Sequence, residues 1–177
     1  MTLSRAEPRD APEFSRPVDE RQLTAKPVAI EASEDERKAL ARRFALVAIK
    51  RLQATVTFER VREALAARGR LSAAIVQSCA VSGDDLPVSI DEPLVLRFVP
   101  VQVAEGEEVE LDANDLDEIP FEGHTFDLGE AVAQSLALAI DPYAVGPQAE
   151  RARKEAGLSD EAASGPFAAL RALKKDS

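Results

Sequence analysis

Tryptophan is absent from this sequence, and there is only one cysteine, one histidine and one tyrosine. A single cysteine excludes an internal disulfide, and one cysteine with one histidine is too few for a Cys/His zinc site. No apolar run is long enough to span a bilayer, and the N-terminus lacks the apolar stretch of a signal peptide. We therefore expect a cytoplasmic protein that binds no metal.

The 177 residues are 45% apolar, enough for one domain whose core rests on Leu, Val, Ile and Ala. The formal net charge of -10 is unevenly distributed. Residues 1–70 hold 15 Lys and Arg against 11 Asp and Glu, whereas residues 71–177 hold 7 against 21. This pattern predicts either an acidic protein with a local basic face or a solvated surface on which the two signs happen to segregate.

The first part of the chain contains signals for one helix and a long strand. We expect a flexible leader at residues 1–13 and a short strand at residues 27–30. Ser33 with Glu36 forms a capping box that begins a helix. β-Branched residues at 46–61 then favour a long strand, and the sequence Arg68-Gly69-Arg70 predicts a turn.

The later part continues with strands and ends with a helix. We expect a strand at 71–79, a turn at 82–85, two strands at 88–90 and 94–103, and a short strand at 109–111. Asp127 caps a helix that Asp141-Pro142 ends. Strands joined by short turns predict an α+β domain over residues 14–146, with an antiparallel sheet flanked by two helices and flexible termini. Whether this sheet closes into a barrel-like form stays open.

Catalytic groups are hard to assemble from this sequence. His124, the only histidine, lies in an expected turn, and no Gly-x-Ser-x-Gly sequence supplies a nucleophile. Cys79 ends an apolar strand and is interpreted as an inert core residue. The acidic residues 107–118 do not fit a calcium loop, because Leu116 or Ile119 falls where an oxygen ligand is required. We expect no catalytic residue, no cofactor, no metal site and hence no enzyme.

Basic residues gather at the end of the first helix, at the start of the long strand and around its hairpin turn. Such clusters are typical of phosphate contact, although charged strand edges that prevent edge pairing have the same composition. Base stacking is not expected, because aromatic residues do not interleave with the cations. The candidate RNA-binding residues are Arg42, Arg43, Lys50, Arg51, Arg60, Arg62, Arg68 and Arg70.

Residues 147–177 are predicted to be a charged linker, with a short helix at 148–156 and an amphipathic C-terminal segment. Phe167, Leu170 and Leu173 share one side of a helix at 166–175. A helix this short is marginal in water, so we interpret it as a partner-docking motif. The competing interpretation is that it packs on its own fold.

The order of these motifs resembles the YceD family, the large ribosomal RNA subunit accumulation proteins. The similarity lies in residues 73–82, in residues 86–100, in the acidic stretch that follows, and in residues 126–138 with Asp141-Pro142-Tyr143. It covers roughly residues 14–150. The resemblance implies a bacterial or plastid protein needed for accumulation of 23S ribosomal RNA, and it brings no catalytic residues. Many members have Cys-x-x-Cys at the central strand, but here Ser82 replaces the second cysteine, so a metal site is not carried over.

The sequence and the resemblance together lead to two functional hypotheses. The first is a non-enzymatic ribosome-biogenesis factor that supports 23S ribosomal RNA, or large-subunit assembly, through contact with RNA or a pre-ribosomal particle. The alternative is a protein-only adaptor whose acidic half binds a basic large-subunit ribosomal protein. Salt-dependent RNA binding separates the two.

Overall fold

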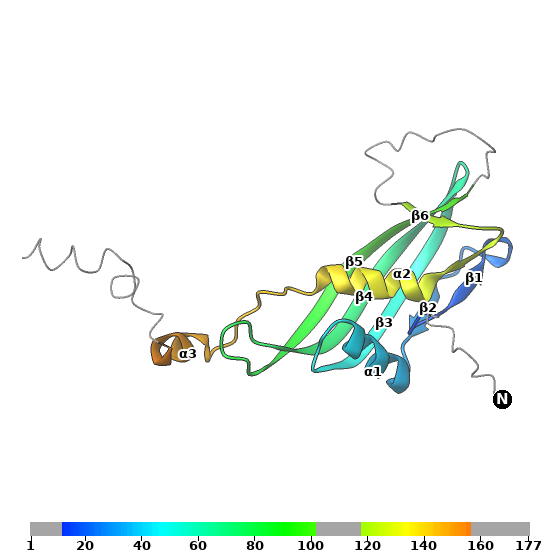
Figure 1. The fold of residues 1–177 in the computed structure, drawn as a ribbon. Helices are drawn as coiled ribbons and strands as arrows, with labels where there is room; N and C mark the ends of the chain where they lie inside the picture. The colour runs from blue at the N-terminus through cyan, green and yellow to red at the C-terminus, as the bar shows by residue number, and fades with distance from the viewer. Residues whose placement is uncertain (1–11, 102–117, 157–177) are drawn as a thin grey trace, which may run out of the picture.

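The computed structural model describes residues 12–101 and 118–156, which form a mixed α+β fold (Figure 1). The elements in chain order are β1 (Pro17–Asp19), the 3-10 helix η1 (Glu20–Gln22), β2 (Val28–Glu31), α1 (Glu34–Arg43), β3 (Ala48–Val61), β4 (Ala64–Ser78), β5 (Asp85–Pro100), β6 (Glu118–Phe121), β7 (Thr125–Asp127), α2 (Leu128–Ala139) and α3 (Ala149–Glu155). The expected leader at 1–13 lies mostly outside the described residues. The expected strand at 109–111 and the C-terminal segment with Phe167, Leu170 and Leu173 lie wholly outside them.

Five strands form one sheet in the order β2-β3-β4-β5-β6, and β1 pairs with β7 separately. The antiparallel expectation is confirmed for β2 to β5. It is wrong for β6, which runs parallel to β5. In the described part of the chain β2 and β6 are the edges of an open sheet, so the barrel-like form is not confirmed.

Both predicted helix starts are confirmed. Each could be predicted because the hydrogen bonds that cap the helix join groups at most three residues apart. Ser33 Oγ accepts from Glu36 N, and a Glu36 carboxylate oxygen accepts from Ser33 N, which completes the capping box of α1. Asp127 Oδ1 accepts from Glu130 N at the start of α2. The short charged helix expected at 148–156 is present as α3.

One prediction about a turn and one about two strands are wrong. The β3–β4 turn lies at Arg62 and Glu63, and Gly69 lies inside β4. A Cβ at Gly69 would come within 1.9 Å of Thr55 O, so this glycine permits close approach of two strands. The two strands expected at 88–90 and 94–103 are one strand, β5. Pro93 interrupts no bond on the β6 side, because β6 pairs only from Arg97 onward.

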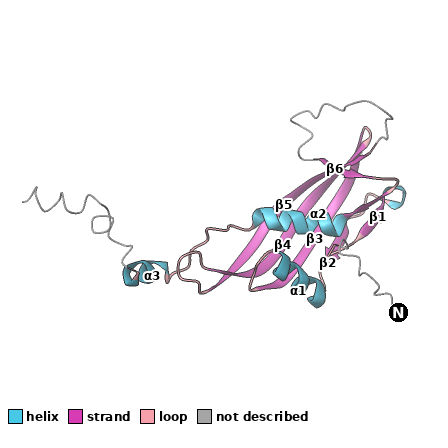
Figure 2. Cartoon of the chain, viewed as in Figure 1, coloured by secondary structure: helices cyan, strands magenta, loops and turns pink. Residues whose placement is uncertain are grey.

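The hydrophobic core lies between the sheet and the two helices α1 and α2, which cover the same face (Figures 1 and 2). Leu40 of α1 and Val132 of α2 are fully buried in this core. Phe98 and Phe126 stack with ring centroids 4.1 Å apart, and Phe58 packs beside both. Since burial of a large apolar side chain contributes about 1.5–3 kcal/mol, these contacts fix the helices on the sheet. No described helix covers the other face.

Candidate functional site

The face of the sheet opposite α1 and α2, here called the uncovered face, is one of two surfaces that hold predicted site residues. Alternation along β3 buries Leu52, Ala54 and Val56 and turns the residues between them to this face. The strand register places Thr57 and Arg68 side by side. The face therefore carries small polar side chains and arginines, together with the exposed Val95, which is paired with Arg68.

Four arginines lie on the uncovered face, and two of them are neutralised. Arg70 Nε lies 2.6 Å from Asp91 Oδ1, and Arg97 Nε lies 3.0 Å from Glu118 Oε1. The hydrogen bond to Asp91 raises the pKa of Arg70, and the same bond lowers the pKa of the Asp91 carboxyl. Arg51 donates to Ser72 Oγ at 3.4 Å, and neither it nor Arg68 has an ion pair among the described residues.

Arg60 and Arg62 lie at the hairpin end, away from Arg68 and Arg70. The four arginines expected around one hairpin turn therefore do not gather at one end of the sheet, because the turn comes six residues earlier than Arg68. Arg60 Nη2 pairs with Glu20 Oε2 at 2.9 Å, and His124 Nδ1 lies 2.8 Å from Glu20 Oε1. The hydrogen bonds with His124 and then Arg60 lower the pKa of Glu20. His124 therefore connects the turn before β7 to η1 through its side chain and its backbone carbonyl, which accepts from Glu20 N at 2.9 Å.

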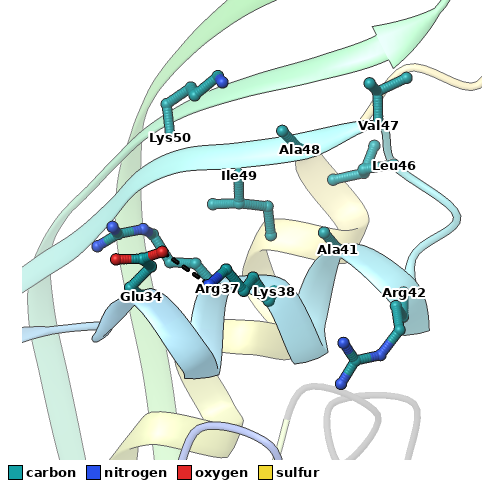
Figure 3. A pocket seen from close by; sticks show the side chains of 10 residues that line it. All are labelled: Glu34, Arg37, Lys38, Ala41, Arg42, Leu46, Val47, Ala48, Ile49 and Lys50. Carbon is teal, nitrogen blue, oxygen red and sulfur yellow. Dashed lines mark ion pairs between the residues drawn. The ribbon is translucent and has the colours of Figure 1, made fainter.

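The second surface is a groove of about 480 Å³ between α1 and the start of β3, here called the α1–β3 groove (Figure 3). Arg42 and Lys50 line it, and neither has an ion pair among the described residues. Arg43, next to Arg42, does not line it. Its guanidinium binds Glu130 at 2.8 Å and Glu13 at 2.9 Å, and the Glu130 bond is the main cause of its raised pKa.

The eight candidate residues therefore do not form one cluster. Three of them, Arg43, Arg60 and Arg70, are held by acids that lie far away in the sequence. Sequence reasoning missed these partners because only tertiary packing brings them close. The other five candidates have no ion pair in the described part of the chain: Arg42, Lys50, Arg51, Arg62 and Arg68.

Cys79 lies in the turn between β4 and β5, and this turn is hydrogen-bonded to the segment that follows α2. Cys79 is buried, and its Sγ accepts hydrogen bonds from Gly146 N at 3.3 Å and Ser82 N at 3.4 Å. The bond from Gly146, followed by those from Ser82, lowers the thiol pKa to about 6. Burial of Cys79 was expected and is confirmed, whereas the hydrogen bonds to its Sγ were not expected.

This loop does not fit a metal ion. Within residues 12–101 and 118–156, no three His, Cys, Asp or Glu side chains lie close enough to hold one. Ser82 Oγ accepts instead from Asp84 N, which stabilises the turn. Gln77 Oε1 nearby is buried without a partner, while its Nε2 donates to Asp141 O at 2.8 Å.

The fold and the two surfaces define a class: an α+β protein with helices on one sheet face and unpaired cations beside the other. The model of the YceD family, the large ribosomal RNA subunit accumulation proteins, matches residues 67–174, and the chain belongs to this family. The matched residues begin within β4, after α1 and β3, whereas the resemblance noted in the sequence began near residue 14. No curated protein and no solved structure matches the chain. None of the helices in the described ranges is long and apolar enough to cross a membrane.

Proposed function

We propose that this protein supports accumulation of 23S ribosomal RNA by contacting the RNA backbone through the uncovered face, without catalysing a reaction. Membership of the YceD family carries the connection to large-subunit ribosomal RNA. The contact itself is supported by Arg51 and Arg68, which project from the uncovered face without an ion pair among the described residues. Arg62, at the hairpin end, is a third cation without an ion pair in the described part of the chain.

The chemistry of the uncovered face favours contact with phosphate and sugar over base reading. The described aromatic rings either pack in the core, as Phe58 and Phe98 do, or lie elsewhere, as Tyr143 does after α2. Base stacking on aromatic side chains is the common means of binding single strands. The outward Thr55, Thr57 and Ser72 supply hydroxyls that suit phosphate and 2′-hydroxyl groups.

The experiment is RNA binding measured over a range of salt concentrations with a large-subunit RNA fragment. Replacing Arg51, Arg62 and Arg68 together by Ser is expected to weaken binding and to reduce the salt slope by about one unit per lost contact. Arg60 and Arg70 are left intact, because each already binds an acid. Arg151→Ser in α3, away from the sheet, is the matched control.

The same variants are then expressed in cells that lack the native protein, and the 23S ribosomal RNA level is measured. We expect the triple variant to restore less 23S ribosomal RNA than the Arg151→Ser control. Equal restoration together with unchanged RNA binding contradicts the proposal. Binding of a basic large-subunit ribosomal protein without any RNA binding favours the adaptor function instead.

A further inference from the structure

The α1–β3 groove combines an apolar floor with a basic rim. Ala41 of α1 and Ile49 of β3 point toward each other across it, and Leu46 lies beside them (Figure 3). Ile49 and Ala41 are buried, whereas Val47 at the mouth of the groove is 49% exposed. A volume of about 480 Å³ is enough for a few side chains of a ligand.

The charge of the groove is positive. Its lining contains four cations and only one acid, Glu34, which lies 2.7 Å from Lys38 Nζ. Arg37 donates to the carbonyl oxygen of Ala32 at 2.8 Å. Arg42 and Lys50 have no ion pair in the described part of the chain. An occupant of this groove should therefore carry negative charge.

The backbone beside the groove also has an unused edge. β2 ends at Glu31, opposite Gln53, so in the described ranges the residues of β3 before Leu52 pair with a strand only on the β4 side. An extended segment placed there would continue the line of β2. The bulge between Ile49 and Arg51 limits such pairing to a short segment.

We propose that the α1–β3 groove binds a short extended acidic segment of a partner protein. An apolar side chain of the segment packs on Leu46 and Ile49, and its carboxylates bind Arg42 and Lys50. RNA fits this site less well, because phosphates and sugars make no use of an apolar floor. The groove lies beside α1, whereas the proposed RNA contact is on the uncovered face; Lys50, which extends from β3 on the side away from α1 in Figure 3, lies at the edge between the two.

The β5–β6 linker, residues 102–117, leaves and rejoins the sheet at the hairpin end, where Phe98 pairs with both Leu65 and Ile119. The groove lies at the opposite end of β3, at Leu46 to Lys50. We therefore assign the occupant to a partner protein and not to this linker.

The test uses a labelled peptide with the sequence of residues 105–115, in which Val109 and Leu111 alternate with acids. We expect saturable binding to the full-length protein by fluorescence anisotropy. Arg42→Glu with Lys50→Glu should weaken it at least about tenfold. Val47→Ser should weaken it by about threefold or more, because Val47 is exposed and its replacement leaves the core intact.

Matched controls distinguish binding at a specific site from nonspecific electrostatic attraction. Arg62→Glu and Val61→Ser change a cation and a 44% exposed valine at the other end of β3 and should leave binding unchanged. A peptide with both apolar residues replaced by Ser should bind weakly. Absence of saturable binding, equal loss in the controls, or equal binding of the Ser peptide overturns the proposal. Displacement of the peptide by an RNA fragment through Arg42 and Lys50 overturns it too, and leaves RNA contact on the uncovered face untouched.

Discussion

Arg16 and Glu36 form a two-bond ion pair, with Arg16 Nη1 2.6 Å from Glu36 Oε1 and Nη2 2.9 Å from Oε2. The same Glu36 carboxylate caps α1 by accepting from Ser33 N. Asp127 Oδ1, at the start of α2, accepts a hydrogen bond from the backbone N of Arg16 at 2.8 Å. Arg16 thus connects the N-terminal segment to the starts of both helices that cover the sheet.

The Arg16–Glu36 pair makes stability depend on acid pH. The hydrogen bond from Arg16 lowers the pKa of Glu36 from 4.5 to about 2. Because the folded pKa is depressed, the stabilisation is fully present above pH 4.5 and is lost as the pH falls through about 2. We expect Glu36→Gln to lower the free energy of unfolding by about 1 kcal/mol at neutral pH. Urea denaturation at successive pH values should show this difference shrinking below pH 4.5.

Glu59→Gln is the control for this prediction, since Glu59 is exposed and has no ion pair among the described residues. A Glu36→Gln effect that stays constant from neutral to strongly acidic pH would mean that the pair contributes through packing and not through charge.

Gly129 should resist replacement by alanine. In a helix this change usually stabilises by about 1 kcal/mol. Here a Cβ would lie 2.5 Å from Phe14 O and 2.8 Å from Arg16 N, so the N-terminal segment must shift. We expect Gly129→Ala to destabilise by about 2 kcal/mol or more in thermal unfolding. Gly146→Ala is the comparison, because its nearest neighbour is the flexible end of Leu86 at 3.4 Å. Stabilisation by Gly129→Ala would show that this close packing is absent.

The thiol of Cys79 should titrate well below its usual range. Hydrogen bonds from Gly146 N and from Ser82 lower its pKa from 9.0 to about 6. This contribution to stability is therefore present above pH 9 and is lost as the pH falls through about 6. Thiolate absorbance of the folded protein should give a midpoint near 6. Cys79→Ser should remove the matching rise in stability with pH, and a midpoint near 9 in the folded state contradicts the prediction.

We expect no stoichiometric zinc, because one Cys and one His leave a tetrahedral site two ligands short. Elemental analysis of protein purified without a histidine tag decides this. A ratio near one zinc per chain would contradict the prediction and point to carboxylates as the remaining ligands.

Deletion of residues 165–177 tests whether Phe167, Leu170 and Leu173 dock on a partner. Docking predicts a melting temperature within about 2 °C of the full-length protein. Packing of these side chains on the protein's own core predicts a loss of several degrees, because each would contribute about 1.5–3 kcal/mol. Differential scanning calorimetry of the two proteins distinguishes the outcomes.

Much of the local structure could be predicted because its causes are local. Ser33 with Glu36, and Asp127 with Glu130, identify helix starts from groups at most three residues apart. The family could be identified from the order of motifs between residues 73 and 143, since the match at residues 67–174 covers the same stretch.

The misplaced turn has a physical cause. Arg62 adopts a φ of 58° in the β3–β4 turn, a conformation that glycine or asparagine usually signals. Gly69 has the residue type of a turn, but it is needed where two strands approach closely. Glycine has both uses, and only the three-dimensional neighbours distinguish them.

The sequence by itself determined the helix starts, the alternation that separates core from surface, and the unequal charge of the two halves. Tertiary structure decided which cations stay available, because Glu20, Asp91 and Glu130 reach Arg60, Arg70 and Arg43 only after folding. It also created the groove between α1 and β3. Ion pairs and grooves depend on distances in space. The residues of these three ion pairs lie 21 to 87 positions apart in the sequence, so only the packing of the core brings them together.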